Sequence, residues 1–262
     1  MNITNSADGT KIVYDAAGDG PALILVDGAL TVHSSGSASE LTKLLAPRFT
    51  VYGFDRRGRG ESGDTLPYAV DREIDDIEAL IDRAGGPAFL YGHSSGGPLA
   101  MRAAIRLGSK VSKIALYEPP YNNDPGAQES WSRYLRQLKV ALAEGRRGDA
   151  VALFMRFVGT PAEQVDGMRR APFWPGMEAV APTLAYDHAA ILGEPWSVPA
   201  GLAARVPVPA LVMSGDAGLP FMPDAARVLS QAIPRGELRM LAGQTHDVKP
   251  DVLAPVLVEF FT

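Results

Sequence analysis

Short apolar segments that end near a glycine or an acidic residue recur along the chain, and they restrict its fold more than any other feature. They are ALILVDG (22–28), FTVYGFD (49–55), AFLYGHS (88–94), KIALYEP (113–119), ALVMSGD (210–216) and ELRMLAG (237–243). Their hydrophobicity is continuous rather than alternating, which is typical of strands covered on both faces. Ahead of them, ITNSADGTKIVYD (3–15) is predicted to form a hairpin that turns at ADGT.

Segments with apolar residues at helical spacing separate most of these strands. They cover residues 38–46, 71–84, 95–108, 222–233 and 250–261. Strands that alternate with helices predict a mostly parallel sheet with right-handed crossovers. The expected fold class is therefore α/β.

The alternation breaks once, from about Tyr121 to Val206, where no strand segment occurs. The stretch carries helical patterns, several prolines and many large apolar side chains. We predict a helical cap at residues 121–206, inserted over the carboxyl ends of the strands. Residues 1–120 and 207–262 then form the core, because no linker is long enough to separate independent domains.

Composition narrows the class of protein. The chain has 262 residues, of which 46% are hydrophobic, and a net charge of −5 with scattered basic residues, which predicts a globular protein without nucleic-acid or membrane partners. It has no cysteine, which excludes disulfides, thiolate metal sites and cysteine nucleophiles. The start of the sequence lacks a basic leader and an apolar segment, so we expect a soluble, cytoplasmic protein with a small-molecule substrate. A homodimer remains open.

The segment GHSSG (92–96) passes from a predicted strand directly into a predicted helix, with Ser94 at the turn. Gly92 and Gly96 lie two residues before and after it, and their lack of side chains lets strand and helix approach closely while the serine hydroxyl projects. Ser94, rather than Ser95, therefore has the spacing of a nucleophile. Ser95 begins the helix, so its backbone N–H points to the space where an oxyanion would form.

Three motifs together resemble the α/β-hydrolase family. They are GHSSG, VDGAL (26–30) after an early strand and FDRRGRGES (54–62) after the next. The resemblance covers nearly the whole chain and implies an eight-stranded, mostly parallel sheet flanked by helices, with a helical cap insertion. It specifies the fold and the reaction class well, and the substrate poorly.

The base that would accept the serine proton must be one of four histidines. His93 adjoins the nucleophile on a strand and is expected to point away from it, whereas His188 lies in the predicted insertion and His33 in the first loop. His246 follows the last strand, where a loop at the carboxyl edge can bring its imidazole to Ser94. Neutral imidazole, with a pKa near ~6.5, can accept the proton and return it to the leaving group.

The acid that would orient His246 has two candidates. In the family it commonly lies three residues after the glycine that ends the penultimate strand, and that position here is Gly218. Asp216 is two residues early, and Glu118 ends the strand after the nucleophile helix, where some family members carry their acid. We favour Glu118 modestly and keep Asp216 open. Either acid would orient the histidine and stabilise the imidazolium.

The first loop supplies the remaining candidates. The family often has His-Gly before the residue whose N–H donates to the oxyanion, and the corresponding residues here are Asp27, Gly28 and Ala29. The resemblance therefore implies Ala29 N–H as the second donor, with Gly28 beside the substrate. We expect Asp27 to point away and to hydrogen-bond locally. His33 and Ser34 are further candidates for the pocket wall.

Two charged segments resemble binding sites. GRGESG (58–63) matches a dinucleotide fingerprint, but Asp64 and Pro67 prolong the loop instead of opening a helix, so no cofactor is predicted. We expect a surface turn rich in arginine, containing Arg56, Arg57 and Arg59. We also expect a solvated helix face rather than a metal site from the acidic cluster Asp71, Asp75, Asp76 and Glu78.

Large apolar side chains in the predicted cap favour an apolar pocket. Those assigned to its wall are Phe154, Phe157, Trp174 and Trp196. We predict a cofactor-independent serine hydrolase that cleaves a small, largely apolar carboxylic ester, thioester or lactone through an acyl-enzyme. Two alternatives remain: a non-hydrolytic or carbon–carbon bond reaction at the same site (lyase, cyclase or perhydrolase), and a non-catalytic ligand-binding protein.

Overall fold

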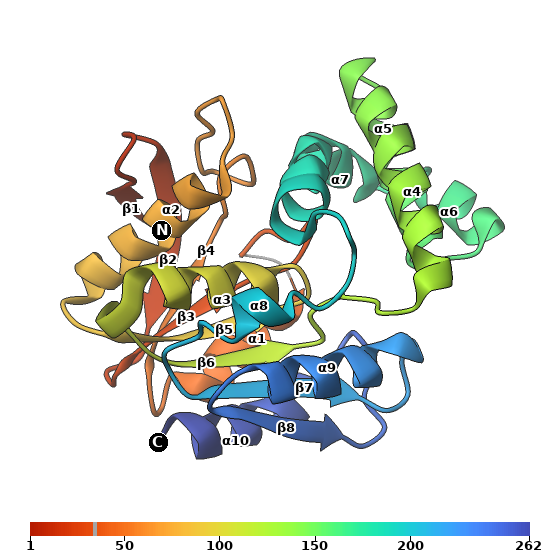
Figure 1. The fold of residues 1–262 in the computed structure, drawn as a ribbon. Helices are drawn as coiled ribbons and strands as arrows, with labels where there is room; N and C mark the ends of the chain where they lie inside the picture. The colour runs from red at the N-terminus through yellow and green to blue at the C-terminus, as the bar shows by residue number, and fades with distance from the viewer. Residues whose placement is uncertain (34–35) are drawn as a thin grey trace.

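An eight-stranded sheet forms the centre of the computed structural model, which describes residues 1–33 and 36–262 (Figure 1). The strands lie in the order β1-β2-β4-β3-β5-β6-β7-β8, and only the pairings β1–β2 and β2–β4 are antiparallel. The predicted eight-stranded, mostly parallel sheet is therefore confirmed. The strands are β1 (Asn2–Asn5), β2 (Lys11–Ala17), β3 (Ala22–Val26), β4 (Thr50–Phe54), β5 (Ala88–His93), β6 (Val111–Tyr117), β7 (Ala210–Gly215) and β8 (Gly236–Leu241).

The hairpin between β1 and β2 is also confirmed. Ser6 N–H donates to Thr10 C=O at 2.9 Å, and Gly9 in the turn has a φ of 83°, a left-handed conformation that glycine adopts without steric cost. This edge of the sheet is the one made of antiparallel strands.

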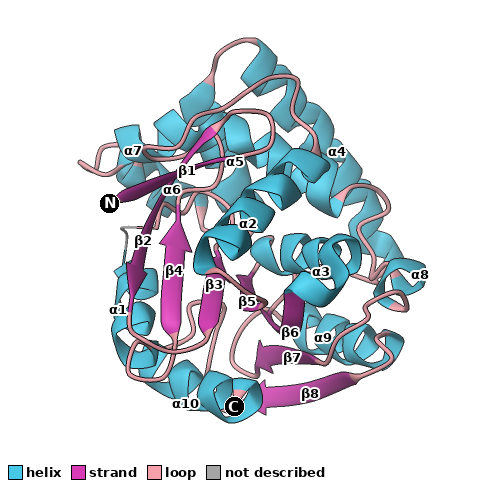
Figure 2. Cartoon of the chain, turned by 90° about the vertical axis from the view of Figure 1, so that its left-hand side faces the viewer, coloured by secondary structure: helices cyan, strands magenta, loops and turns pink. Residues whose placement is uncertain are grey.

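Helices cover both faces of the sheet (Figure 2). Consecutive strand residues belong to different cores: Ile24 and Val26 of β3 pack on one face, and Leu23 and Leu25 on the other. Two covered faces explain why the strands are continuously hydrophobic. The flanking helices are α1 (Gly36–Leu45) and α10 (Pro250–Phe261) on one face, and α2 (Val70–Ala84), α3 (Gly96–Leu107) and α9 (Phe221–Ala232) on the other.

A run of helices without a strand separates β6 from β7. Figure 1 shows α4, α5 and α6 grouped apart from the sheet and its flanking helices. The division into core and cap stays a prediction, but the predicted helical character of the segment is observed. Its elements are α4 (Pro125–Ala143), α5 (Arg147–Phe157), α6 (Ala162–Met168), α7 (Trp174–Val180), a 3-10 turn η2 (Ala181–Thr183), a π-helical turn η3 (Tyr186–Leu192) and α8 (Ala200–Ala203). None of the described helices is both long enough and apolar enough to span a bilayer.

The two charged segments were predicted at the surface, and for most of their side chains this is wrong. Arg56, Arg57 and Arg59 are each at most 1% exposed, and Asp76 is fully buried. Arg57 makes two hydrogen bonds to Asp76, at 2.8 and 2.7 Å. The arginine turn and the acidic face of α2 pack against each other, so each segment satisfies charges that would be costly to bury alone.

Candidate active site

Ser94 lies at a sharp turn between β5 and α3. Its φ is 53°, and its N–H donates to Tyr117 C=O at 2.9 Å. A Cβ at Gly96 would lie 2.0 Å from Val26 C=O, so only glycine lets α3 begin this close to β3. The serine hydroxyl therefore projects at the carboxyl edge of the sheet, as the GHSSG pattern predicts.

Positive φ angles at non-glycine residues gather at this edge. Among the described residues they occur at Leu30 (59°), Ser94 (53°) and Glu118 (45°). Each such conformation costs about 1–3 kcal/mol and persists only where the surroundings impose it. All three belong to segments that follow neighbouring parallel strands, β3, β5 and β6. Backbone strain in this part of the chain therefore coincides with the candidate site.

The imidazole of His246 is held by Glu118. His246 Nδ1 lies 2.7 Å from Glu118 Oε2, and the glutamate side chain is fully buried. Ser214 hydroxyl and Gly215 N–H both donate to the other carboxylate oxygen at 3.0 Å. Because a carboxylate only accepts, Nδ1 of His246 carries the proton and Nε2 keeps a lone pair.

The structure brings Glu118, and not Asp216, to the histidine. Asp216 is exposed and accepts a hydrogen bond from Gly243 N–H at 2.6 Å, which closes the loop after β8. A Cβ at Gly218 would lie 3.5 Å from His246 N and 3.8 Å from Glu118 Oε1. The family's usual acid position therefore adjoins the histidine but has no side chain, and Glu118 reaches the same place from β6.

A cavity of about 580 Å³ opens beside these residues, and both Ser94 and His246 line it. No hydrogen bond joins their side chains among the described residues, a common feature of catalytic pairs without bound substrate. The apolar part of the lining is Pro120, Trp131, Phe154, Met155, Phe157, Val158, Leu192, Trp196, Leu219, Phe221 and Met222.

Of the residues predicted to contact substrate, Gly28, Phe154, Phe157 and Trp196 line the cavity. Trp174 and His33 do not. The indole N–H of Trp174 donates to Glu178 at 2.9 Å within a separate small core of the helical insertion, which also contains Val151 and Val165.

His33 is instead buried against carboxylates of the first strands. Its Nε2 lies 3.1 Å from Asp15 Oδ2, and its backbone N–H donates to Asp55 at 2.9 Å. These contacts with Asp15 and Asp55 are sufficient to explain the position of His33. Ser34 lies outside the described residues.

Two histidines that the sequence gave no reason to place there also line the cavity. His93 does not point away as expected, and its ring centroid is 5.0 Å from that of His246. Burial, with the nearby His246, lowers the pKa of His93 to about 3. Burial also lowers the pKa of His188 to about 4. Both rings are therefore neutral near pH 7, and neither competes with His246 for Glu118.

The candidate oxyanion donors belong to the two segments next to Ser94, the first loop and the start of α3. A Cβ at Gly28 would be 2.9 Å from Ser94 Cβ, so the first loop passes directly against the serine. Ala29 lines the cavity, and Ser95 is buried at the start of α3. Neither backbone N–H donates to another described residue, which leaves both for a ligand oxygen.

A buried group of charges supports these donors, and we call Arg56, Arg59, Glu73 and Asp187 the arginine cluster. Asp187, in η3, accepts hydrogen bonds from Arg56 at 2.7 Å, Arg59 at 2.6 Å and Ser95 hydroxyl at 2.8 Å. Arg56 also makes two hydrogen bonds to Glu73, at 2.7 and 2.8 Å. All four side chains are at most 2% exposed.

The arginine cluster also fixes the first loop. Arg56 donates to Asp27 C=O at 3.1 Å, and Arg59 donates to Gly28 C=O. The two carbonyls therefore point towards guanidinium groups. The side chain of Asp27 does not satisfy the expectation of local hydrogen bonding, because its buried Oδ2 has no partner among the described residues. Burial raises the pKa of Asp27 to about 6.

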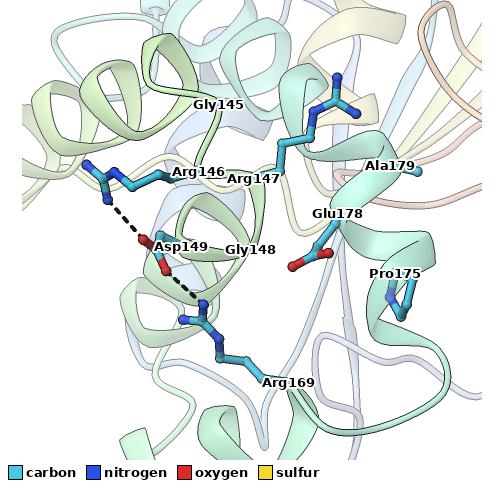
Figure 3. Close-up of a pocket in the computed structure, with 9 residues that line it drawn as sticks. All are labelled: Gly145, Arg146, Arg147, Gly148, Asp149, Arg169, Pro175, Glu178 and Ala179. Carbon is cyan, nitrogen blue, oxygen red and sulfur yellow. Dashed lines mark hydrogen bonds and ion pairs between the residues drawn. The ribbon is translucent and has the colours of Figure 1, made fainter.

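A second cavity, of about 540 Å³, lies on the helical insertion (Figure 3). Asp149 lies between Arg146 and Arg169 and pairs with both, at 3.0 and 2.8 Å. No serine, threonine or histidine is among the described residues that line this cavity. Across the described residues, no cluster of acidic and histidine side chains has the arrangement of a metal site.

Comparison with known proteins gives concordant matches. Residues 29–256 match the model described as the alpha/beta hydrolase family. An alpha/beta hydrolase from Sphaerobacter thermophilus is 46% identical, with a TM-score of 0.88 and 100% of both chains covered. The pimeloyl-(acyl-carrier protein) methyl ester esterase of Nitrosospira multiformis is 27% identical over 90% of this chain and 91% of its own. A proline iminopeptidase of Pestalotiopsis fici is 29% identical over 50% of this chain, a match that spans 49% of that protein.

Proposed function

The chain belongs to the alpha/beta hydrolase family, and on this premise we propose that it is a serine hydrolase that needs no cofactor and cleaves a small, largely apolar ester, thioester or lactone. In this proposal Ser94 is the nucleophile, His246 the base and Glu118 the acid. The observation that carries it is the 2.7 Å contact between His246 Nδ1 and buried Glu118, at the wall of the cavity that Ser94 also lines.

The proposed reaction begins with attack of Ser94 Oγ on the substrate carbonyl carbon. His246 Nε2, whose lone pair is free because Nδ1–H is bound to Glu118, accepts the hydroxyl proton. The resulting imidazolium lies beside the carboxylate of Glu118, which accepts two further hydrogen bonds and stabilises the new positive charge. His246 then returns the proton to the leaving alcohol, and water releases the acyl group by the reverse sequence.

The oxyanion of the tetrahedral intermediate is assigned to the N–H groups of Ala29 and Ser95. The close approach of the first loop to Ser94 and the place of Ser95 directly after it support this role, as does the N-terminus of α3, which favours negative charge. One such donor typically contributes about 10²–10³-fold in rate. The arginine cluster contributes indirectly, because it orients the carbonyls of the loop that carries Ala29.

The apolar lining of the cavity supports a small, largely apolar substrate. The Nitrosospira relative is named as a methyl ester esterase, which agrees with ester cleavage. Glu118 takes the place of the acid that is missing at Gly218, and this supports a catalytic site over a purely ligand-binding protein.

The proposal is tested with p-nitrophenyl butyrate and an alkyl phosphonate that reacts with activated serines. The parent should show a burst of p-nitrophenol, and it should gain the mass of one phosphonyl group as the leaving group of the phosphonate departs. Ser94→Ala should lose both the labelling and about 10⁴-fold or more of the turnover. Unchanged turnover in Ser94→Ala, or turnover in the parent with no acyl-enzyme formed, would contradict the assignment.

A further inference from the structure

Among the polar groups of the cavity wall that have no part in the proposed reaction, one is deeply buried. It is Nε2 of His188, a residue of η3 that is 5% exposed and lines the cavity. This nitrogen forms no hydrogen bond with a described residue. It is also not one of the polar atoms that are both inaccessible to solvent and without a hydrogen-bond partner. It therefore opens on the cavity. Thr160, the other polar lining side chain from the helical insertion, is half-exposed.

The hydrogen-bonding state of His188 is fixed by Tyr134. The tyrosine hydroxyl lies 2.7 Å from Nδ1 and has no other hydrogen-bond partner among the described residues. Burial raises the pKa of Tyr134 well above its usual value, so the phenol keeps its proton. It donates that proton to Nδ1, which leaves the hydrogen of the neutral imidazole on Nε2. The cavity wall thus carries one fixed N–H donor.

Aromatic rings surround this donor. The ring centroids of Phe154 and Trp131 lie 5.1 and 5.6 Å from that of His188, and Trp131 stacks on Trp196 at 4.7 Å. Both indole N–H groups are already used, by the carbonyls of Gly193 and Pro120. The rings therefore offer only apolar surface to a ligand. A hydrogen bond from this part of the wall must come from His188.

The charge of the cavity limits what that donor can bind. No lysine or arginine is among the described lining residues, and the acidic one, Asp247, is exposed. A carboxylate among these rings would have no cation to compensate its desolvation, which is expensive. The acceptor that fits is a neutral oxygen, such as the carbonyl of a ketone, amide or second ester.

The donor also has a fixed place relative to the nucleophile. Asp187, the preceding residue, accepts hydrogen bonds from Ser95 hydroxyl and both arginines of the arginine cluster. The η3 turn is thereby tied to the residue after Ser94. Asp187 is anchored to the core, and His188, the next residue along the chain, faces the cavity. This arrangement suits a residue that recognises a group of the substrate.

We propose that His188 is a specificity-determining residue, whose Nε2–H donates to a neutral acceptor on the apolar, ring-bearing part of the substrate. Tyr134 acts as a positioning residue that holds the donor tautomer. The substrate class is then a neutral ester that carries a second carbonyl oxygen away from the scissile one. The ester class of the substrate and its scissile carbonyl rest on the proposed hydrolase function, but the donor site itself does not depend on that function.

The kinetic test uses substrates that differ by one carbonyl. They are p-nitrophenyl 4-oxo-4-phenylbutanoate against p-nitrophenyl 4-phenylbutanoate, and, for the reverse orientation, 2-oxo-2-phenylethyl acetate against 2-phenylethyl acetate. The ratio of kcat/KM within each pair is compared between the parent and His188→Phe, so that intrinsic reactivity cancels. In at least one pair the preference for the carbonyl should fall about ten-fold in the variant, the effect of one well-placed hydrogen bond.

Three variants separate recognition from packing. His188→Gln retains an N–H donor and should keep part of the preference. Tyr134→Phe frees Nδ1 to take the proton and should give an intermediate loss. Thr160→Val, which removes the other polar lining group of the insertion, should leave the ratio within about two-fold of the parent. The urea unfolding midpoint serves as the control for folding in every variant.

A binding measurement keeps this inference distinct from the proposed function. Propiophenone and propylbenzene are titrated against the fluorescence of the lining Trp131 and Trp196, with no turnover required. Tighter binding of the ketone in the parent, lost in His188→Phe, supports the donor even if no ester is hydrolysed, in which case only the proposed function fails. Equal ratios in parent and His188→Phe, in both kinetic pairs and in binding, would overturn the role of His188.

Discussion

Two buried carboxylates near Ser94 each accept three hydrogen bonds, and they differ in the charge that faces them. Glu118 accepts from Ser214, Gly215 and His246, none of which carries a positive charge while the imidazole is neutral. Asp187 accepts from Ser95 and two arginines, Arg56 and Arg59, which are always charged. Glu118 therefore gains a positively charged partner only during the proposed reaction, whereas the charge of Asp187 is compensated by two arginines throughout.

This difference distinguishes the carboxylate suited to a catalytic role, Glu118, from the one suited to a structural role, Asp187. A carboxylate whose partner gains a proton during the reaction lowers the energy of that step, which is the requirement for the acid of a triad. A carboxylate locked between guanidinium groups cannot respond to the reaction, but it fixes the positions of everything bonded to the same arginines. We therefore expect substitution at Glu118 to reduce the rate, and substitution at Asp187 to reduce stability.

The largest expected effect is on turnover in Glu118→Gln. An amide can donate to His246 Nδ1, which allows the wrong tautomer and removes the charge that stabilises imidazolium. The rate of ester hydrolysis should fall by about 10⁴-fold, with the urea unfolding midpoint changed little by comparison. Steady-state kinetics and a urea titration measure the two effects on the same preparation.

Asp216→Asn is the matched control, because it makes the same acid-to-amide change at the other candidate. Asp216 is exposed and bonds only Gly243 N–H among the described residues, a contact that an asparagine oxygen also makes. Its turnover should stay within a few-fold of the parent, about 1 kcal/mol or less. A greater loss in Asp216→Asn than in Glu118→Gln would reassign the acid.

The next largest effect is on the stability of Asp187→Asn. The substitution leaves Arg56 with Glu73 alone and Arg59 with no hydrogen-bonded carboxylate among the described residues. Breaking a buried ion pair on one side typically costs about 3–5 kcal/mol in free energy of unfolding. Urea denaturation at pH 7 measures it, and Arg239→Ala, which removes an exposed pair with Glu259, should cost under about 1 kcal/mol. Equal losses of unfolding free energy in Asp187→Asn and Arg239→Ala would contradict the structural role that distinguishes Asp187 from Glu118.

Gly28→Ala tests how closely the first loop is held to the nucleophile. The added methyl would start 2.9 Å from Ser94 Cβ, so the loop must shift and carry Ala29 N–H away from the oxyanion. We expect kcat to fall by about 10²-fold, as for loss of one oxyanion donor. Gly86→Ala is the control, because no atom lies within 4 Å of its added methyl. Wild-type kcat in Gly28→Ala would remove Ala29 from the assignment.

The sequence predicted the elements that depend on local pattern. Continuous apolar strands, helical periodicity and the glycine spacing around Ser94 each follow from contacts within a few residues, and the sheet with its turn formed as expected. The family's usual position for the acid is Gly218, which has no side chain, and Glu118 could still be named as a candidate because both residues follow parallel strands that end at one edge of the sheet.

The sequence could not predict what depends on partners far apart in the chain. The arginine turn was expected at the surface because Asp187, which is 131 residues away from Arg56, gives no local sign of pairing with it. Trp174 and Trp196 are both large and apolar, and only the tertiary arrangement sends one to a core and the other to the cavity. His188 was set aside because it lies in the insertion, although η3 returns to the nucleophile.

The smallest effect concerns pH, and it tests whether the region around η3 is as fixed as the comparison requires. Burial lowers the pKa of His188 to about 4, so between that value and the ordinary 6.5 the unfolded chain binds a proton that the folded chain does not. His188 should therefore contribute a fall of about 2 kcal/mol in the free energy of unfolding as the pH drops from 7 to 5, and buried His93, whose pKa is lowered to about 3, contributes in the same direction. Asp27, whose pKa is raised to about 6 by burial, contributes in the opposite direction, because the folded chain binds its proton first.

Subtracting the pH profile of His188→Phe from that of the parent cancels the contribution of Asp27 and isolates that of His188. Parallel profiles between pH 7 and pH 5 would show that His188 takes up a proton in the folded protein, and η3 would then not be the fixed support that the comparison requires.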